Sequence, residues 1–241
     1  HEALLGTELP PAGRLEFQKI GGGPRSTSPH GTACAEIVYD VAPSLEKMYL
    51  LEAATGLDVE LAIDQLTAAG VRIISASFSF PYTTFMDGTG FLDDELARFR
   101  TSGGLYVSSA GNYRKGTWWG PFTDPDGDGW LSLTGSGDNE LNVFVLDDGR
   151  TCLFPVGREL TTALRWSQST APQTDLDLFL YRYDTETSEW TKAAESIDLQ
   201  NGLSSQDASE YISHKTTAEG QYAVAIRRKS GTTDVDIHLY A

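Results

Sequence analysis

The pattern of apolar and polar positions changes near residue 115. Before this point, stretches in which apolar residues recur at helical spacing alternate with short apolar runs. The helical stretches are Cys34–Val41, Val59–Ala69 and Leu92–Phe99, and the short runs are Leu45–Leu51, Val71–Ser77 and Leu105–Ser109. Short strands joined by helices of about three turns require right-handed crossovers. This half of the chain therefore predicts a three-layer α/β fold, in which helices cover both faces of a parallel sheet.

After residue 120 the chain shows short runs rich in aromatic and β-branched residues, separated by turn signals such as Asp148-Gly149 and Ser230-Gly231. The runs are Leu141–Leu146, Cys152–Val156, Leu160–Trp166, Leu176–Tyr183, Tyr211–Thr216, Tyr222–Arg228 and Val235–Tyr240. About seven such strands predict an all-β antiparallel sandwich of the jelly-roll type. We therefore expect two domains, residues 1–117 and residues 118–241.

Three segments of the first half follow one another in a recognisable order. The first is Pro29-His30-Gly31-Thr32-Ala33-Cys34-Ala35, which runs on to Ala42-Pro43. The second is Gly70–Ser79, and the third is Gly104–Asn112, which ends in Ala-Gly-Asn. Together they resemble the histidine motif, the substrate-binding strand and the oxyanion strand of the subtilisin-like serine proteases (peptidase family S8). The resemblance covers about residues 30–112 and implies part of a subtilisin-like core.

The resemblance implies a role for each matched residue. His30 would act first as general base and then as general acid, because imidazole exchanges protons near neutral pH. Asn112 would donate an amide N–H to the oxyanion of the tetrahedral intermediate. Ser77, Phe78 and Ser79 would offer backbone groups to an extended peptide or protein substrate. Ser77-Phe78-Ser79-Phe80-Pro81 replaces the Ser-Leu-Gly-Gly of the family, so side chains stand where glycine normally leaves room for the specificity pocket.

Two members of the catalytic triad do not occur in the expected settings. No Asp occurs among residues 1–29, and no Gly-Thr-Ser precedes an Ala-x-Pro helix start. We expect the acid before His1 and the nucleophilic serine after Ala241. The chain is thus interpreted as a segment of a secreted serine endopeptidase that does not hydrolyse peptides by itself. A propeptide is a further candidate partner.

The second half resembles the pre-peptidase C-terminal β-sandwich that is attached to many secreted proteases. The Asp175-Leu176-Asp177-Leu178 run and the Asp234–Leu239 run carry this resemblance. This sandwich follows the Asn112 strand and not the catalytic serine, so we expect it to interrupt the protease domain. An alternative interpretation is a noncatalytic scaffold protein, in which a degenerate protease core carries a carbohydrate-binding or protein-binding sandwich.

Charge adds two expectations. The 34 acidic and 18 basic residues give a net charge of −16, which disfavours nucleic acid and anionic membranes as partners. Asp124, Asp126 and Asp128 alternate around a glycine-containing turn, a spacing that suits a structural calcium ion. A solvated acidic turn explains the same pattern, and both interpretations stay open. Cys34 and Cys152 fit no zinc or redox spacing, so two separate buried thiols are expected instead of a disulfide bridge.

Overall fold

The computed structural model describes residues 4–22, 26–78, 85, 88, 91–112, 116–134, 140–146, 148–168 and 171–241. The chain folds as two compact units. Unit 1 contains His1–Phe80 and Phe91–Gly111, and unit 2 contains Pro81–Gly90 and Asn112–Ala241. Within the described ranges, no helix has the length and the apolar character needed to cross a bilayer.

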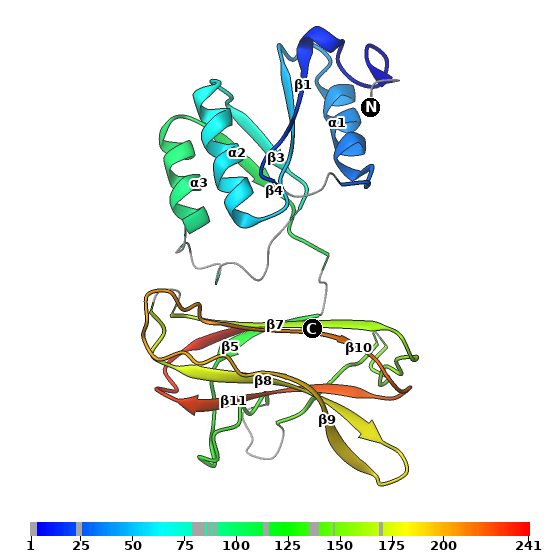
Figure 1. Cartoon of the computed structure of the whole chain (residues 1–241), viewed down its shortest axis with the longest axis vertical. Helices are drawn as coiled ribbons and strands as arrows, with labels where there is room; N and C mark the ends of the chain where they lie inside the picture. Colours follow the sequence, from blue (N-terminus) through cyan, green and yellow to red (C-terminus); the bar gives the residue numbers. More distant parts are fainter. Residues whose placement is uncertain are drawn as a thin grey trace. The chain divides into compact units, whose positions relative to one another are not determined.

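Unit 1 contains all three α-helices of the described residues and four short strands (Figure 1). In chain order its elements are the 3-10 helix η2 (Ala12–Arg14), β1 (Leu15–Lys19), α1 (His30–Val41), β2 (Met48–Glu52), α2 (Gly56–Ala68), β3 (Ile73–Ala76), α3 (Phe91–Thr101) and β4 (Leu105–Ser108). Strand β1 pairs in parallel with β2, and β3 pairs in parallel with β4. The parallel strands thus form two separate pairs.

Helices α2 and α3 lie side by side over one face of the β3–β4 pair (Figure 1). Helix α2 begins with a capping box, in which the Thr55 side chain accepts the backbone N–H of Asp58 and the Asp58 carboxylate accepts that of Thr55. Val59 and Ile63 of α2 pack with Phe99 of α3 in a small buried cluster. This cluster anchors Ile74 and Tyr106 on the inner face of the strand pair.

The prediction of a three-layer α/β fold for the first half of the chain is wrong. The parallel strands form two isolated pairs instead of one sheet, and most strands of the described chain are antiparallel. The outer face of the β3–β4 pair carries Ile73, Leu105 and Val107, which are 66%, 56% and 51% exposed, so none of the described helices covers it. Periodicity reports each helix and strand locally, whereas the pairing of β2 with β3 would depend on contacts between distant segments.

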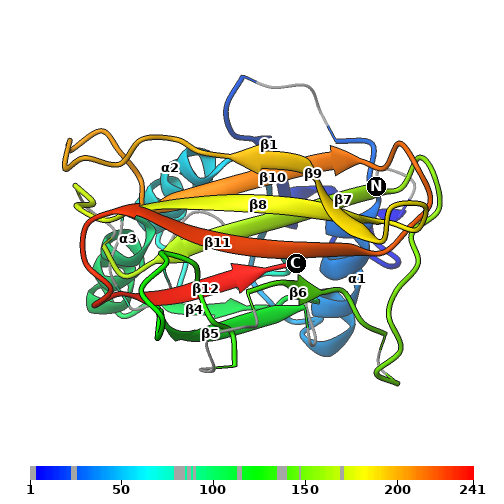
Figure 2. The ribbon, with the colours of Figure 1, turned by 90° about the horizontal axis from the view of Figure 1, so that it is seen from below.

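Unit 2 is an antiparallel β-sandwich of two four-stranded sheets, which lie as two layers in Figure 1 and are seen from another side in Figure 2. The first sheet has the order β10-β7-β12-β5 and the second β6-β11-β8-β9. The strands are β5 (Thr117–Pro121), β6 (Asn142–Val143), β7 (Glu159–Trp166), β8 (Asp175–Asp184), β9 (Glu189–Ser196), β10 (Ser209–Lys215), β11 (Tyr222–Ser230) and β12 (Asp236–Tyr240).

The main core of the protein lies between these two sheets. Leu176, Leu178 and Leu180 of β8 are fully buried in it, as the alternating pattern of this strand predicts. Trp166 and Tyr222 are the largest side chains that are completely buried there. The segment 152–156, for which the sequence predicts a strand, forms none; Phe154 makes an isolated bridge with Gly220 and packs against the core.

Candidate functional site

His30 is the first residue of α1, and it is exposed. Its backbone N–H donates to the Ser28 hydroxyl 3.3 Å away, which supplies a partner at the open end of the helix. The helix ends one residue before Ala42-Pro43, because proline cannot continue a helix. These local signals hold the imidazole at the start of a helix whose buried residue, Ala35, packs in a cluster with Met48 of β2.

The imidazole of His30 contacts the end of a strand that lies 47 residues further along the chain. Its Nε2 atom is 2.8 Å from the carbonyl oxygen of Ser77, the residue that follows β3. A carbonyl oxygen only accepts hydrogen bonds, so Nε2 carries the proton in this arrangement. A half-turn of the ring about Cβ–Cγ exchanges Nε2 with Cε1 and releases Nε2. The structure therefore brings together the first and second of the three sequence segments.

The third sequence segment, which contains β4, contacts the second segment at the carboxyl end of β3. Because β3 and β4 are parallel, their carboxyl ends lie together. The Ser109 N–H donates to the Ala76 carbonyl at 3.0 Å, and the Ser109 hydroxyl donates to the Phe78 carbonyl at 3.4 Å. Ser77 and Phe78 are exposed here, and Ser79 lies outside the described residues. Asn112 is an exposed residue that belongs to unit 2, whereas His30 belongs to unit 1.

A cavity of about 660 Å³ opens beside His30 within unit 1. Strands β2 and β3 form two of its walls, and α1 and α2 contribute further apolar side chains. Cys34, one helical turn after His30, also lines it, and its sulfur is 3.8 Å from His30 Nε2. The cavity thus combines an imidazole, a thiol and the carbonyl end of a strand. Both cysteines are free thiols.

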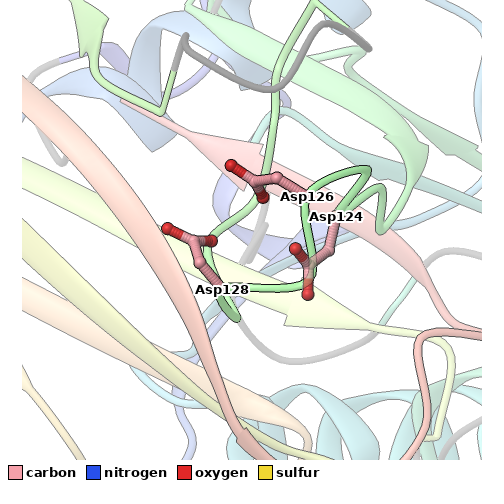
Figure 3. Close-up of side chains that lie close together, drawn as sticks. All are labelled: Asp124, Asp126 and Asp128. Atoms are coloured by element: carbon pink, nitrogen blue, oxygen red, sulfur yellow. The ribbon is translucent and has the colours of Figure 1, made fainter.

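The three aspartates of the acidic loop lie close together (Figure 3). Each of Asp124, Asp126 and Asp128 offers an oxygen within 4.8 Å of the others. Two oxygens bound to one calcium ion at its usual bond lengths are at most about 5 Å apart, so the donor set fits this ion. The Asp126 and Asp128 side chains are exposed, which leaves room for water ligands.

Asp124 also organises the loop itself. Its side chain is only 2% exposed, and its carboxylate accepts the backbone N–H of Gly127 at 2.9 Å and of Gly129 at 3.1 Å. Both glycines adopt positive φ angles, 78° and 92°, which other residues rarely adopt. Arg228 of β11 donates to the same carboxylate at 3.2 Å. The loop is therefore held in shape by protein groups, with an arginine beside the three carboxylates.

Comparisons with known proteins give distant likenesses. No model of a known protein family matches the sequence, and a comparison with curated proteins finds no relative. The structure is similar to that of the CspB protease of Clostridium perfringens, with 11% identity and a TM-score of 0.44 over 80% of this chain and 42% of that one. This chain therefore spans less than half the length of that protease structure.

Two other solved structures match about half of the chain. One is the K3 cleaved adhesin domain of Lys-gingipain from Porphyromonas gingivalis, with 15% identity, a TM-score of 0.25 and coverage of 51% of this chain and 88% of that one. The other holds the CBM22-1 and GH10 modules of xylanase 10B from Clostridium thermocellum, with 12% identity, a TM-score of 0.26 and coverage of 52% and 24%. At these identities and TM-scores, none of the likenesses assigns a function.

Sequence reasoning missed a buried carboxyl group in the sandwich. Glu210 of β10 is 2% exposed and accepts hydrogen bonds from the Ser196 hydroxyl and from the Gln200 amide, the latter at 2.9 Å. Burial raises the pKa of Glu210 to about 7, and the negative charges of Asp198 and Asp177 act in the same direction. One sequence signal could have found it, because Glu210 lies two residues before Ile212 and therefore shares the buried face of β10.

Cys34 and Arg228 were also missed as neighbours of the predicted sites. Cys34 could have been found from its spacing, because residues four apart lie on the same face of a helix. The position of Arg228 beside Asp124 could not, since 104 residues separate the two in the sequence.

Proposed function

We propose that this chain is the histidine-bearing part of a secreted serine endopeptidase of the subtilisin type. Its substrate is an extended segment of a peptide or protein, and the catalytic acid and the nucleophilic serine belong to polypeptide outside residues 1–241. The observation that carries this proposal is the 2.8 Å contact between His30 Nε2 and the Ser77 carbonyl. The imidazole thus lies at the exposed end of β3, and this strand would offer backbone groups to an extended peptide.

The tautomer of His30 explains why the chain would be inactive without its missing groups. A general base needs a free lone pair, and Nε2 has none while it donates to the Ser77 carbonyl. A carboxylate placed at Nδ1 would accept a hydrogen bond from Nδ1–H and hold the ring so that Nε2 can take the proton of a serine hydroxyl. The catalytic acid would therefore do two things, orienting the ring and choosing its tautomer.

Two features support a role for the neighbouring strand ends. The hydrogen bonds from Ser109 to Ala76 and Phe78 hold the β3 and β4 ends in register. Asn112 follows Ser109 by three residues, and the resemblance to the subtilisin-like proteases implies that its amide would donate to the oxyanion. Phe78 is 40% exposed and would contact a substrate side chain.

The test is active-site labelling of the full-length protein with a fluorophosphonate, which reacts with activated serines. We expect the wild type to be labelled and His30→Ala to lose at least about 100-fold in labelling rate, because the serine would lose its base. The control is His214→Gln, a histidine of the sandwich, which should be labelled like the wild type. A wild type that is not labelled, or a His30→Ala variant that is labelled normally, would contradict the proposal.

We also propose that calcium binds Asp124, Asp126 and Asp128 and stiffens the loop that precedes the sandwich core. The support is the spacing of their oxygens, within 4.8 Å of one another, and the exposure of two of the three side chains. Such an ion would be structural: it would tie the loop together and would take no part in peptide hydrolysis.

The second candidate function is noncatalytic binding of carbohydrate or protein by the sandwich. It is favoured by an aromatic row formed by Trp130 and two residues of β8, in which the ring centroids of Trp130 and Phe179 are 5.3 Å apart and those of Phe179 and Tyr181 are 6.4 Å apart. Trp130 and Tyr181 are partly exposed, whereas Phe179 is buried between them. Arg227 lies 5.4 Å from the Trp130 ring. Calorimetric titration with oligosaccharides would test it: Trp130→Ala should abolish binding, and Trp119→Ala, on the other sheet, should not.

A further inference from the structure

Cys34 and His30 form a thiol–imidazole pair at the wall of the unit 1 cavity. They lie one turn apart on α1, and the Cys34 sulfur is 3.8 Å from His30 Nε2. Cys34 is partly exposed, and both residues line the cavity of about 660 Å³ together with Ser77. A small molecule in this cavity can therefore reach the sulfur and the imidazole at the same time.

We propose that Cys34 is a thiol-modification site that controls His30, and that its reactants are small disulfides and thiol-directed electrophiles. When Nε2 is released from the Ser77 carbonyl and the ring proton is on Nδ1, Nε2 takes the thiol proton, and the resulting thiolate attacks one sulfur of a disulfide R–S–S–R. A new bond forms between Cys34 and one sulfur, the R–S–S–R bond breaks, and the leaving thiolate takes the proton from the imidazolium. The disulfide supplies the oxidising equivalents, so no further reactant is needed.

The adduct would act on His30 because of where the sulfur lies. A group attached to Sγ occupies the space next to Nε2, the atom that binds the Ser77 carbonyl. The ring must then turn away or lose this contact. The effect on catalysis rests on the proposed function, whereas the reactivity of Cys34 does not.

Cys152 provides an internal comparison. It is also a free and partly exposed thiol, but it belongs to unit 2. In the part of the chain that the structure describes, no histidine bonds to its sulfur. If Cys34 reacts faster with a disulfide than Cys152 does, the imidazole of His30 explains the difference better than solvent exposure does.

The first test measures both cysteines in the intact protein with glutathione disulfide and with iodoacetamide at pH 7, using peptide mass spectrometry. We expect Cys34 to react about tenfold faster than Cys152, and His30→Gln to slow Cys34 about fivefold or more while Cys152 is unchanged. Equal rates for the two thiols, or no effect of His30→Gln on Cys34, would overturn the proposal.

The second test asks whether the adduct disables His30. Glutathionylation of Cys34 should shift the imidazole NMR signals of His30 and stop fluorophosphonate labelling of the full-length protein, and dithiothreitol should restore both. Cys34→Ser should be labelled normally and resist glutathione disulfide. Unchanged His30 signals in the adduct would overturn the control of His30. Full-length protein that is never labelled would count against the proposed protease function, and the NMR readout would still decide the present inference.

Discussion

The Arg228 guanidinium lies 3.2 Å from a carboxylate oxygen of Asp124, and this ion pair joins β11 to the acidic loop. The same oxygen accepts the Gly129 N–H. Arg228 is therefore a protein cation beside the three carboxylates, in the position where it competes with a metal ion for Asp124. This relationship leads to two predictions about calcium.

Arg228→Gln should strengthen calcium binding. The guanidinium lies about 3 Å from a ligand oxygen and would repel a bound calcium ion, so its removal should tighten binding. We expect about a 5- to 10-fold lower Kd for calcium in isothermal titration calorimetry. The control is Arg227→Gln, the adjacent residue, which lies over the Trp130 ring instead. Weaker binding in Arg228→Gln would show that this arginine orders the site more than it repels the ion.

Asp126→Asn should remove the stabilisation that calcium gives to the wild type. A ligand at ten times its Kd stabilises the folded state by about 1.4 kcal/mol, which is measured as a rise in Tm. Asp126 is chosen because it is exposed, whereas Asp124 also holds the loop through Gly127 and Gly129. Asp148→Asn, in another exposed turn, should keep the full response. If the Tm of the wild type does not change in millimolar calcium, the loop is a solvated acidic turn and not a calcium site.

Glu210 should make the sandwich less stable as the pH rises from about 4.5 to about 7. Its pKa is raised from 4.5 to about 7 in the folded protein, so between these values the folded state binds more protons than the unfolded state. Stability is then highest below about pH 4.5, falls across this window and is flat above it. The shift corresponds to on the order of 3 kcal/mol.

Glu210→Gln is the matched variant for this prediction, because it keeps hydrogen-bonding groups near Ser196 and Gln200. We expect the difference in unfolding free energy between the variant and the wild type to grow in favour of the variant as the pH rises to 7. The comparison cancels the contribution of His238, whose pKa is lowered by burial and whose effect on stability has the opposite sign. It also cancels that of Asp175, whose pKa is raised by burial. A constant difference across this pH range would refute the assignment.

Leu178→Ala should destabilise unit 2 by about 2–5 kcal/mol in urea unfolding, because the side chain is completely buried between the two sheets. Leu199→Ala removes the same atoms from a side chain that is 61% exposed, and we expect it to cost less than about 0.5 kcal/mol. Similar losses of unfolding free energy in the two variants would show that Leu178 is not part of the core.

Helices and strands were predictable where apolar residues recur at a clear helical or strand spacing. Val59, Ile63 and Leu66 recur at helical spacing and are all buried in α2. The alternation of β8 correctly separates the core leucines from Asp175 and Asp177, although both aspartates are buried as well. Strands β1, β5 and β9 were missed: none of them contains a fully buried residue, so the apolar pattern that marks a buried strand face is weak in each.

The apolar stripe of α1 shows the limit of periodicity. Ile37, Val38 and Val41 have helical spacing, which predicts a buried face, yet they are 65%, 37% and 83% exposed. Spacing shows that three apolar residues share a face of the helix, but only the neighbouring elements decide whether anything covers that face.

The sequence by itself determined the positions of the helices, most strands of the sandwich and the order of the three segments that contain His30, Ser77 and Asn112. These features depend on residues close together in the chain, where spacing and turn chemistry act directly. The tertiary structure decided that β1–β2 and β3–β4 remain separate pairs, that the Ser77 carbonyl meets His30, and that Glu210 is buried. Each of these depends on contacts between distant segments, which the free energy of the whole packed chain selects.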